Sequence, residues 1–303
     1  MNRKDFLYAC GMALPLSWFG CTGRAISPQQ TKRKEKFSFA FFTDVHLNPN
    51  DGKNSEEGLR KALRDAKARK VDFIWFGGDN VETDRFPKED ENAANALHAR
   101  FRQIVDESGM ECHFTIGNHD RFYFREGQKD ERGYQLFEKY FGPSYHSFDH
   151  KGIHFIALNS MDPDKEGNYS IGAEQMEWLQ KDLRSVGEKA PIIVSLHVPM
   201  LSLYYPVVEG NFKGLDMISN TKPLFELLKS YDLRLVLQGH QHIHEELLER
   251  DHWFVTAGAV CANWWNGPLV DTQEGYIVVH VDTENQITWE YIDYKWEVQK
   301  TDL

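Results

Sequence analysis

The feature that most constrains the fold is an alternation of β-type hydrophobic runs with amphipathic helical segments, which begins at Phe37. Residues 37–43 form the first run, and Leu59 and Leu63 then recur at helical spacing within residues 55–70. Further strands are expected at 72–76, 113–116, 145–149, 153–159, 191–196 and 233–238, and further helices at 87–108, 129–141, 173–186 and 222–230. Such alternation requires a layered α/β architecture.

The C-terminal part breaks this alternation. Strands are expected at residues 254–257, 276–281 and 287–294, with no helix between them. We therefore predict an α/β fold in which a two-sheet β-sandwich is flanked by helices, in α-β-β-α layers, rather than a simple doubly wound sheet. This domain covers residues 37–303 and includes the C-terminal strands from about residue 254.

Polar side chains follow five of the expected strands, and function in α/β folds resides in the loops after strand ends. The five blocks read Asp44-Val45-His46, Gly78-Asp79, Gly117-Asn118-His119-Asp120, His197 and Gly239-His240-Gln241-His242. Each block alone has a plainer interpretation, because Asp, Asn and Gly are common turn residues and a single histidine is often buried in a core. Five blocks at five strand ends favour one shared site.

The candidate ligands exceed the three or four that one zinc site needs. They comprise two carboxylates, four imidazoles and one amide: Asp44, Asp79, His46, His197, His240, His242 and Asn118. Such a set suits two divalent ions that share a carboxylate, and mixed nitrogen and oxygen ligands fit Mn, Fe or Zn. Paired ions stabilise the attacking and leaving oxygens in phosphoryl transfer.

In this order, the blocks resemble those of the calcineurin-like metallophosphoesterases over about residues 37–260. The resemblance implies a two-sheet fold and hydrolysis of a phosphodiester or phosphomonoester by metal-bound hydroxide. It assigns one ion to Asp44, His46, Asp79 and His242, and the other to Asp79, Asn118, His197 and His240. It makes His119 the catalytic group that faces the phosphate and either stabilises the transition-state charge or protonates the leaving oxygen. Asp120 is expected to orient His119; a turn cap is the alternative for Asp120.

Two subfamilies differ at specific positions. Purple acid phosphatases carry Gly where His46 stands and a tyrosine ligand where this chain has Glu82. The Ser/Thr protein phosphatases lack the Gly-His-x-His block. The nearest resemblance is to bacterial phosphodiesterase-type members, including the class III cyclic nucleotide phosphodiesterases.

Substrate contacts are expected from Arg121 and from the long segment 200–220, which contains Tyr204 and Tyr205. Packing of the segment on its own core, and a solvated charge at Arg121, are the alternatives. Of the adjacent Trp264 and Trp265, at most one is expected to face a cleft, and packing in the core or at the rim is the other interpretation.

The N-terminus has the pattern of an export signal. A basic start precedes the apolar residues 6–19, and Gly20-Cys21 resembles a lipoprotein cleavage site. We expect a signal peptide at residues 1–20, of lipoprotein type, a polar tether at 21–36, and a periplasmic or cell-envelope location. A retained N-terminal helix is the alternative. Membrane attachment is expected only through a lipid on Cys21, since no later apolar run approaches a membrane span.

Composition narrows the function classes. A net charge of −11 disfavours bulk nucleic-acid binding and so points to a small substrate, whose phosphate would need local positive charge such as bound divalent ions. Four cysteines exclude a disulfide-dense scaffold, and Cys112 and Cys261 are more typical of buried apolar residues than of a bridge. Two other functions stay open: a non-catalytic lipoprotein that binds metal or phosphate, and a nuclease acting on short oligonucleotides.

Overall fold

The computed structural model describes residues 35–50, 52–87, 90–122, 132–211 and 216–298. The expected signal peptide, Cys21 and most of the tether lie outside these residues. The structure therefore leaves the expectations for export and lipid attachment as predictions.

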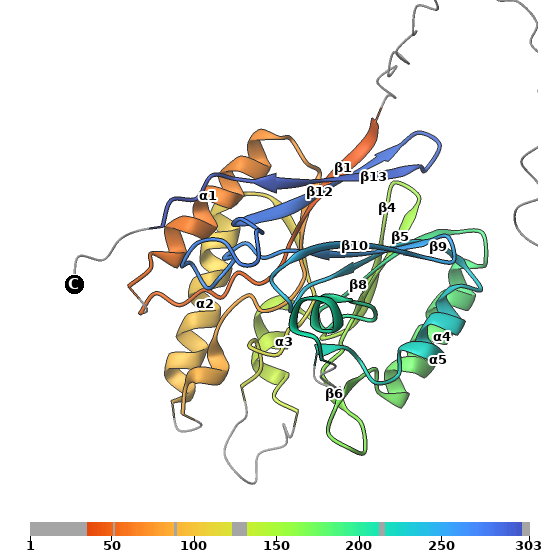
Figure 1. Ribbon diagram of the computed structural model, residues 1–303, viewed down its shortest axis with the longest axis horizontal. Coiled ribbons are helices and arrows are strands. Elements are labelled where there is room, and N and C mark those ends of the chain that lie inside the picture. Colours follow the sequence, from red (N-terminus) through yellow and green to blue (C-terminus); the bar gives the residue numbers. More distant parts are fainter. Residues whose placement is uncertain (1–34, 51, 88–89, 123–131, 212–215, 299–303) are drawn as a thin grey trace, which may run out of the picture. The chain divides into compact units, whose positions relative to one another are not determined.

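Two sheets form the centre of the domain (Figure 1). The first has five strands in the order β13 (Ile287–Asp293), β12 (Gly275–Asp282), β1 (Glu35–Phe42), β2 (Phe73–Phe76) and β3 (Glu111–Phe114). The second has six, in the order β10 (His244–Glu249), β11 (His252–Ala257), β9 (Asp232–Gln238), β8 (Pro191–Leu196), β5 (Ile153–Leu158) and β4 (His146–His150). The strands β1, β2 and β3 run parallel, as do β5, β8, β9 and β11, so their carboxyl ends share an edge.

An aromatic layer joins the two sheets. Phe39 of β1 meets Phe155 of β5 edge-on, with ring centroids 5.4 Å apart, and Trp75 of β2 lies 5.6 Å from the same ring. Alternate residues of β1 point the other way, so that Phe42 belongs to the helix-facing core. Because both faces of these strands are buried, their sequences are continuous hydrophobic runs.

Helices cover the outer faces of the sheets. Figure 1 shows α1 (Ser55–Ala68) and α2 (Glu91–Ser108) on one side, and α4 (Ala173–Val186) and α5 (Thr221–Leu228) on the other. Phe76 of β2 packs on Phe101 of α2, and Phe254 of β11 packs on Phe225 of α5. The predicted α-β-β-α layering is thereby confirmed.

Several element boundaries differ from the sequence prediction. The second helix begins at Glu91 rather than at residue 87, because the Asp90 side chain caps it by accepting from the Ala93 amide at 3.1 Å. The third helix, α3 (Gln135–Phe141), is shorter than expected, although residues 129–131 lie outside the described chain. Strand β10 and the two-stranded pair β6 (Asp162–Pro163) and β7 (Tyr169–Ser170) were not anticipated.

Two negative findings concern the described residues alone. None of their helices combines the length and apolarity that a bilayer crossing requires. Cys112 and Cys261 are both free thiols, and Cys261 is fully buried, as expected for small apolar core residues.

Candidate metal centre

Loops after five strands, β1, β2, β3, β8 and β9, converge at the shared edge of the sheets. Backbone hydrogen bonds connect the loops to one another: the Asp44 amide donates to the Gly78 carbonyl at 2.9 Å, and the Gly239 amide donates to the His197 carbonyl at 3.0 Å. The His46 amide likewise donates to the Asp79 carbonyl at 2.9 Å. The side chains at the strand ends are therefore placed by a connected backbone.

The backbone at this edge is strained. Left-handed φ values occur at five residues that carry candidate ligands: Asp44 (53°), His46 (47°), Asp79 (50°), His240 (73°) and His242 (57°). Non-glycine residues in this region cost of order 1–3 kcal/mol each and persist only where surrounding contacts enforce them. Backbone strain that is concentrated at five candidate ligands is typical of a functional site.

Two glycines permit the close packing of these loops. A Cβ on Gly117 would lie 2.2 Å from Oδ1 of Asp79, and a Cβ on Gly78 would lie 2.5 Å from Nδ1 of His197. Gly78 also has a φ of +103°, which side chains rarely tolerate. Glycine before Asp79 and before Asn118 thus reflects a lack of space.

Six of the seven predicted ligands form one cluster, in which five side chains are buried and that of His240 is partly exposed. Nε2 of His242 lies 3.3 Å from Oδ1 of Asp44, and Nε2 of His46 lies 3.8 Å from the same atom. Oδ2 of Asp79 lies 3.0 Å from Nε2 of His197 and 3.6 Å from Nε2 of His46. Asp79 therefore reaches both halves of the cluster, as a shared ligand would.

The second half of the cluster also contains His240. Ligand atoms of Asp79, His197 and His240 lie within 4.8 Å of one another. Asn118, the seventh predicted ligand, lies between Gly117 and His119, and the His119 amide donates to Oδ1 of Asp79 at 2.8 Å. Oδ1 of Asn118 is buried and accepts no hydrogen bond among the described residues. Such an oxygen suits a cation.

The tautomers of two histidines also fit metal binding. Nδ1 of His197 donates to the Gly77 carbonyl at 2.9 Å, and Nδ1 of His242 donates to the Ala262 carbonyl at 2.5 Å. Their Nε2 lone pairs therefore point inward. Nε2 of His46 and Nε2 of His242 are 3.0 Å apart. Imidazole lone pairs and carboxylates held this close, without donors between them, fit divalent cations.

His119 lies beside this cluster and remains partly accessible. Its ring centroid is 4.9 Å from that of His46, and a quarter of its side chain is exposed (25%). Nδ1 contacts Oδ1 of Asp84 at 2.8 Å. Burial lowers the pKa of His119, but the carboxylates of Asp79 and Asp84 outweigh it and raise the pKa above its ordinary value.

The prediction that Asp120 orients His119 is wrong in this structure. The buried Asp120 carboxylate accepts instead from the backbone amides of Gly117 (2.8 Å), Asn80 (2.8 Å) and Val81 (3.1 Å). These amides point at it because the loops after β2 and β3 run side by side, so Asp120 connects the two loops. Asp84, which contacts His119 instead, follows Asp79 by five residues in a short 3-10 helix, η1 (Thr83–Arg85). No spacing rule in the sequence identified it.

The adjacent tryptophans lie in a turn, with φ of 47° at Trp264 and 67° at Trp265, rather than in a strand. Trp265 is buried in the core. Trp264 packs on the metal centre, with its ring centroid 4.3 Å from that of His242 and 5.5 Å from that of His46. Trp264 therefore faces the site and Trp265 does not, because a turn, and not the alternation of a strand, directs the two side chains apart.

Arg121 lies near the centre but contacts it indirectly. Its Nη1 donates to the Met161 carbonyl at 3.4 Å, and its guanidinium lies 5.8 Å from the centroid of the Tyr169 ring. The Tyr169 ring in turn meets His240 edge-on at 6.2 Å.

Tyr204 and Tyr205 stack edge-on at 4.9 Å at the start of the helical turn η2 (Tyr205–Glu209). Burial, and then Asp216, raise the pKa of Tyr205. Oδ1 of Asp216 lies 3.9 Å from Nε2 of His240, so the segment reaches the centre through Asp216. Lys213, in the same segment, lies outside the described residues.

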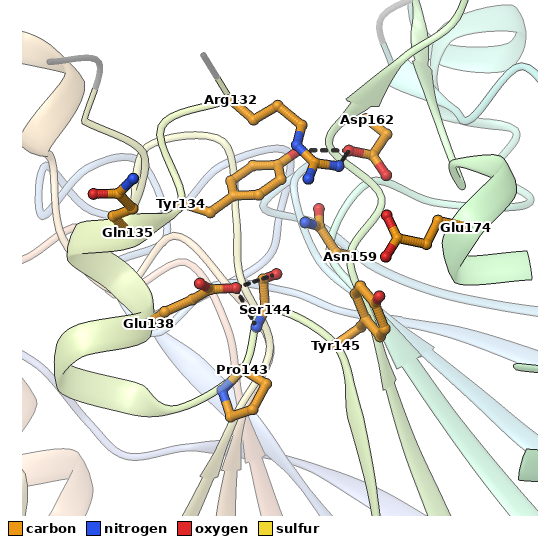
Figure 2. Close-up of a pocket in the computed structure, with 10 residues that line it drawn as sticks. All are labelled: Arg132, Tyr134, Gln135, Glu138, Pro143, Ser144, Tyr145, Asn159, Asp162 and Glu174. Atoms are coloured by element: carbon orange, nitrogen blue, oxygen red, sulfur yellow. Dashed lines mark hydrogen bonds and ion pairs between the residues drawn. The ribbon is translucent and has the colours of Figure 1, made fainter. Parts of the chain in front are cut away.

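A polar cavity of about 660 Å³ opens at the same sheet edge (Figure 2). Asn159 and Asp162 line it after the end of β5, the strand next to β8. Arg132 contacts Asp162 at 3.3 Å, whereas Glu138 and Glu174 add two further carboxylates. With three carboxylates and one guanidinium, this lining disfavours an anionic group. None of the seven predicted metal ligands lines this cavity.

Comparisons with known proteins agree with this geometry. Residues 37–244 match the family model described as calcineurin-like phosphoesterase. The chain is 33% identical over 103 residues to purple acid phosphatase 15 of Arabidopsis thaliana, a match that covers 33% of this chain and 17% of that protein. A second match, purple acid phosphatase 21 of the same plant, is covered over 21% of its length, so the chain spans only a small part of these relatives.

Solved structures share the fold. A dimetal phosphatase from Danio rerio superposes with a TM-score of 0.59 at 13% identity, and the match covers 86% of this chain and all of that one (100%). A purple acid phosphatase from yellow lupin gives a TM-score of 0.60 at 17% identity, covering 87% of this chain and 52% of that one. At these identities the likeness concerns the fold alone.

Proposed function

The chain belongs to the calcineurin-like phosphoesterase family, and we propose that it is a dinuclear-metal phosphoesterase that hydrolyses a small phosphodiester or phosphomonoester. The observation that carries this proposal is the position of Asp79, which lies 3.0 Å from His197 and 3.6 Å from His46 and so joins two groups of ligands. Family members depend on two metal ions, and the ligand set here accommodates Mn, Fe or Zn.

The likeness to the family implies how the residues would divide between the two ions. Asp44, His46, Asp79 and His242 would hold one ion, and Asp79, Asn118, His197 and His240 would hold the other. When bound, such ions neutralise charge on the phosphoryl oxygens and lower the pKa of water. The strained, hydrogen-bonded loops supply this chain's contribution, because they hold the ligands in place before substrate arrives.

His119 would protonate the leaving oxygen. Its Nδ1 contacts Asp84, which leaves Nε2 as the atom that can carry a proton toward the substrate. Asp84 favours the protonated ring and fixes its orientation. After the ester bond breaks, that proton resides on the product hydroxyl and His119 is left neutral.

Two alternatives receive less support. A non-catalytic binding protein would not need His119 and Asp84 beside the ligands. A nuclease acting on short oligonucleotides would gain affinity from a basic surface, whereas the chain carries a net charge of −11 and the neighbouring cavity is rich in carboxylates.

The proposal includes an exported, cell-envelope location with a lipid on Cys21, which rests on the pattern of the first 21 residues. Mass spectrometry of the protein purified from membranes tests it. A chain that begins at Cys21 with a diacylglyceryl mass supports it, and an unprocessed Met1 terminus contradicts it.

The enzymatic proposal is tested by metal analysis and a substrate panel on one preparation. The full chain is loaded with Mn²⁺ or Zn²⁺ and assayed on p-nitrophenyl phosphate, bis(p-nitrophenyl) phosphate and small natural mono- and diesters. We expect two metal equivalents and turnover of at least one ester class. A folded sample with two bound metals that hydrolyses none of them would overturn the proposal.

A further inference from the structure

We propose that Glu82 is a positioning residue for the metal ligand His46, and that its buried charge strengthens one of the two metal sites selectively. This inference rests on the proposed function only for the identity of the ligands. Oε1 of Glu82 lies 3.3 Å from Nδ1 of His46, on the side of the ring away from the ligand cluster, and 2% of the Glu82 side chain is exposed.

Glu82 is itself held in place. Nδ2 of Asn48 donates to its Oε2 at 2.9 Å, and Nη2 of Arg85 lies 2.8 Å from its Oε1. Arg85 is more than half exposed (55%), so it compensates the carboxylate from the solvent side. The carboxylate therefore stays aimed at His46 while its charge is only partly neutralised.

The partner of His46 differs in kind from those of two other ligand histidines. Nδ1 of His197 and Nδ1 of His242 each donate to a neutral backbone carbonyl, of Gly77 and Ala262 respectively. Nδ1 of His46 faces a carboxylate instead. Within the half assigned to His46 and His242, the two imidazoles are thus supported differently, which neither the motif blocks nor their spacing indicates.

The physical consequence concerns the ligand nitrogen. A carboxylate this close to Nδ1 favours the tautomer that carries its proton on Nδ1 and its lone pair on Nε2, and the negative charge increases the basicity of Nε2. It also adds a third negative charge beside Asp44 and Asp79, in a cluster suited to two divalent cations. An isolated buried carboxylate would be costly, so a cation bound at His46 would stabilise Glu82 in return.

The test measures Zn²⁺ affinity directly, by competition with a chromophoric chelator, in the full chain. In E82Q, which keeps the size and removes the charge, we expect one of the two Zn²⁺ dissociation constants to rise about 10–100-fold while the other is unchanged. The conservative E82D should restore part of the affinity, and it serves as the second variant if E82Q does not fold.

Two matched variants separate this role from other roles. D84N removes the carboxylate next to His119, two residues along the chain, and should lower turnover while leaving both Zn²⁺ affinities at wild-type values. R85Q removes the solvent-side ion pair of Glu82 but keeps the contact with His46, so it should also retain both affinities.

A spectroscopic readout addresses His46 itself. In the Co²⁺-loaded protein, the ring N–H protons of ligand histidines give shifted ¹H NMR resonances, and E82Q should move one of them. Wild-type Zn²⁺ affinities in both E82Q and E82D would overturn the proposal, as would equal losses in E82Q and R85Q. A wild type that binds two Zn²⁺ ions but hydrolyses no ester would overturn the proposed function instead. The Zn²⁺ affinities of the variants would still test the role of Glu82.

Discussion

The metal centre and the segment that borders it are built in opposite ways. Asp44, Asp79 and His197 are at most 2% exposed in their side chains and lie on backbone hydrogen-bonded to neighbouring loops. In the turn η2, Val207 is 73% exposed and Val208 is 51% exposed. Many contacts therefore hold the candidate ligands in place, whereas few contacts hold the segment that could select a substrate. Substitutions in the metal centre should abolish turnover, and substitutions in the bordering segment should change KM by small factors.

The largest effect is expected at Asp79, because it serves both halves of the cluster. D79N should lose at least one metal and reduce turnover to the detection limit. Elemental analysis and an ester assay on the same sample check this. D106N, on an exposed part of α2 with an ion pair to Arg102, is the matched control and should behave as wild type. Full activity in D79N would contradict the conclusion that substitutions in the metal centre abolish turnover.

His119 should come next. Removal of a positioned general acid typically costs 10²–10⁴-fold in rate, so H119Q should lose about that much in kcat. Both metals should stay bound, since His119 is assigned outside the ligand set. Metal loss in H119Q would move His119 into the ligand set.

Asp84 should have a smaller effect, with a pH signature. Because Asp84 helps to raise the pKa of His119, protonated His119 persists to higher pH in the wild type than it would without this carboxylate. D84N should lower kcat by about 10–100-fold. It should also shift the alkaline limb of the pH–rate profile to lower pH, as a kcat profile would show. An unshifted alkaline limb would contradict the pairing.

The smallest effect is expected in the bordering segment. Y205F removes the hydroxyl group that interacts with Asp216, and a single hydrogen bond contributes about 0.5–1.5 kcal/mol. We expect KM to change by roughly twofold to tenfold, with kcat and metal content preserved. V207A changes an exposed side chain in the same turn and should leave KM unaltered. Equal changes of KM in Y205F and V207A would contradict a specific role of the Tyr205 hydroxyl group.

The sequence predicted which side chains gather at the candidate site because each one follows a strand, and parallel strands end at a common edge. His46 and His242 are 196 positions apart, yet their Nε2 atoms meet at 3.0 Å, which the order of the blocks and the sheet rule together anticipate. The overall fold followed from the same alternation of strands and helices.

Other features depended on local geometry that no periodic pattern encodes. Glu82 and Asp84 belong to the loop and the 3-10 turn after β2, where the direction of each side chain is set by the turn itself. Asp120 was assigned to its sequence neighbour His119, but three backbone amides compete for its carboxylate. Strand β10 escaped prediction because its glutamates have low β-propensity, and it forms through pairing with β11.

The most direct test of the account is anomalous X-ray diffraction from crystals of the full chain loaded with Mn²⁺ or Zn²⁺. We predict two anomalous peaks with the Asp79 carboxylate between them, one beside His46 and His242 and the other beside His197 and His240. A single peak, or two peaks that do not share Asp79, would contradict the dinuclear centre on which the account depends.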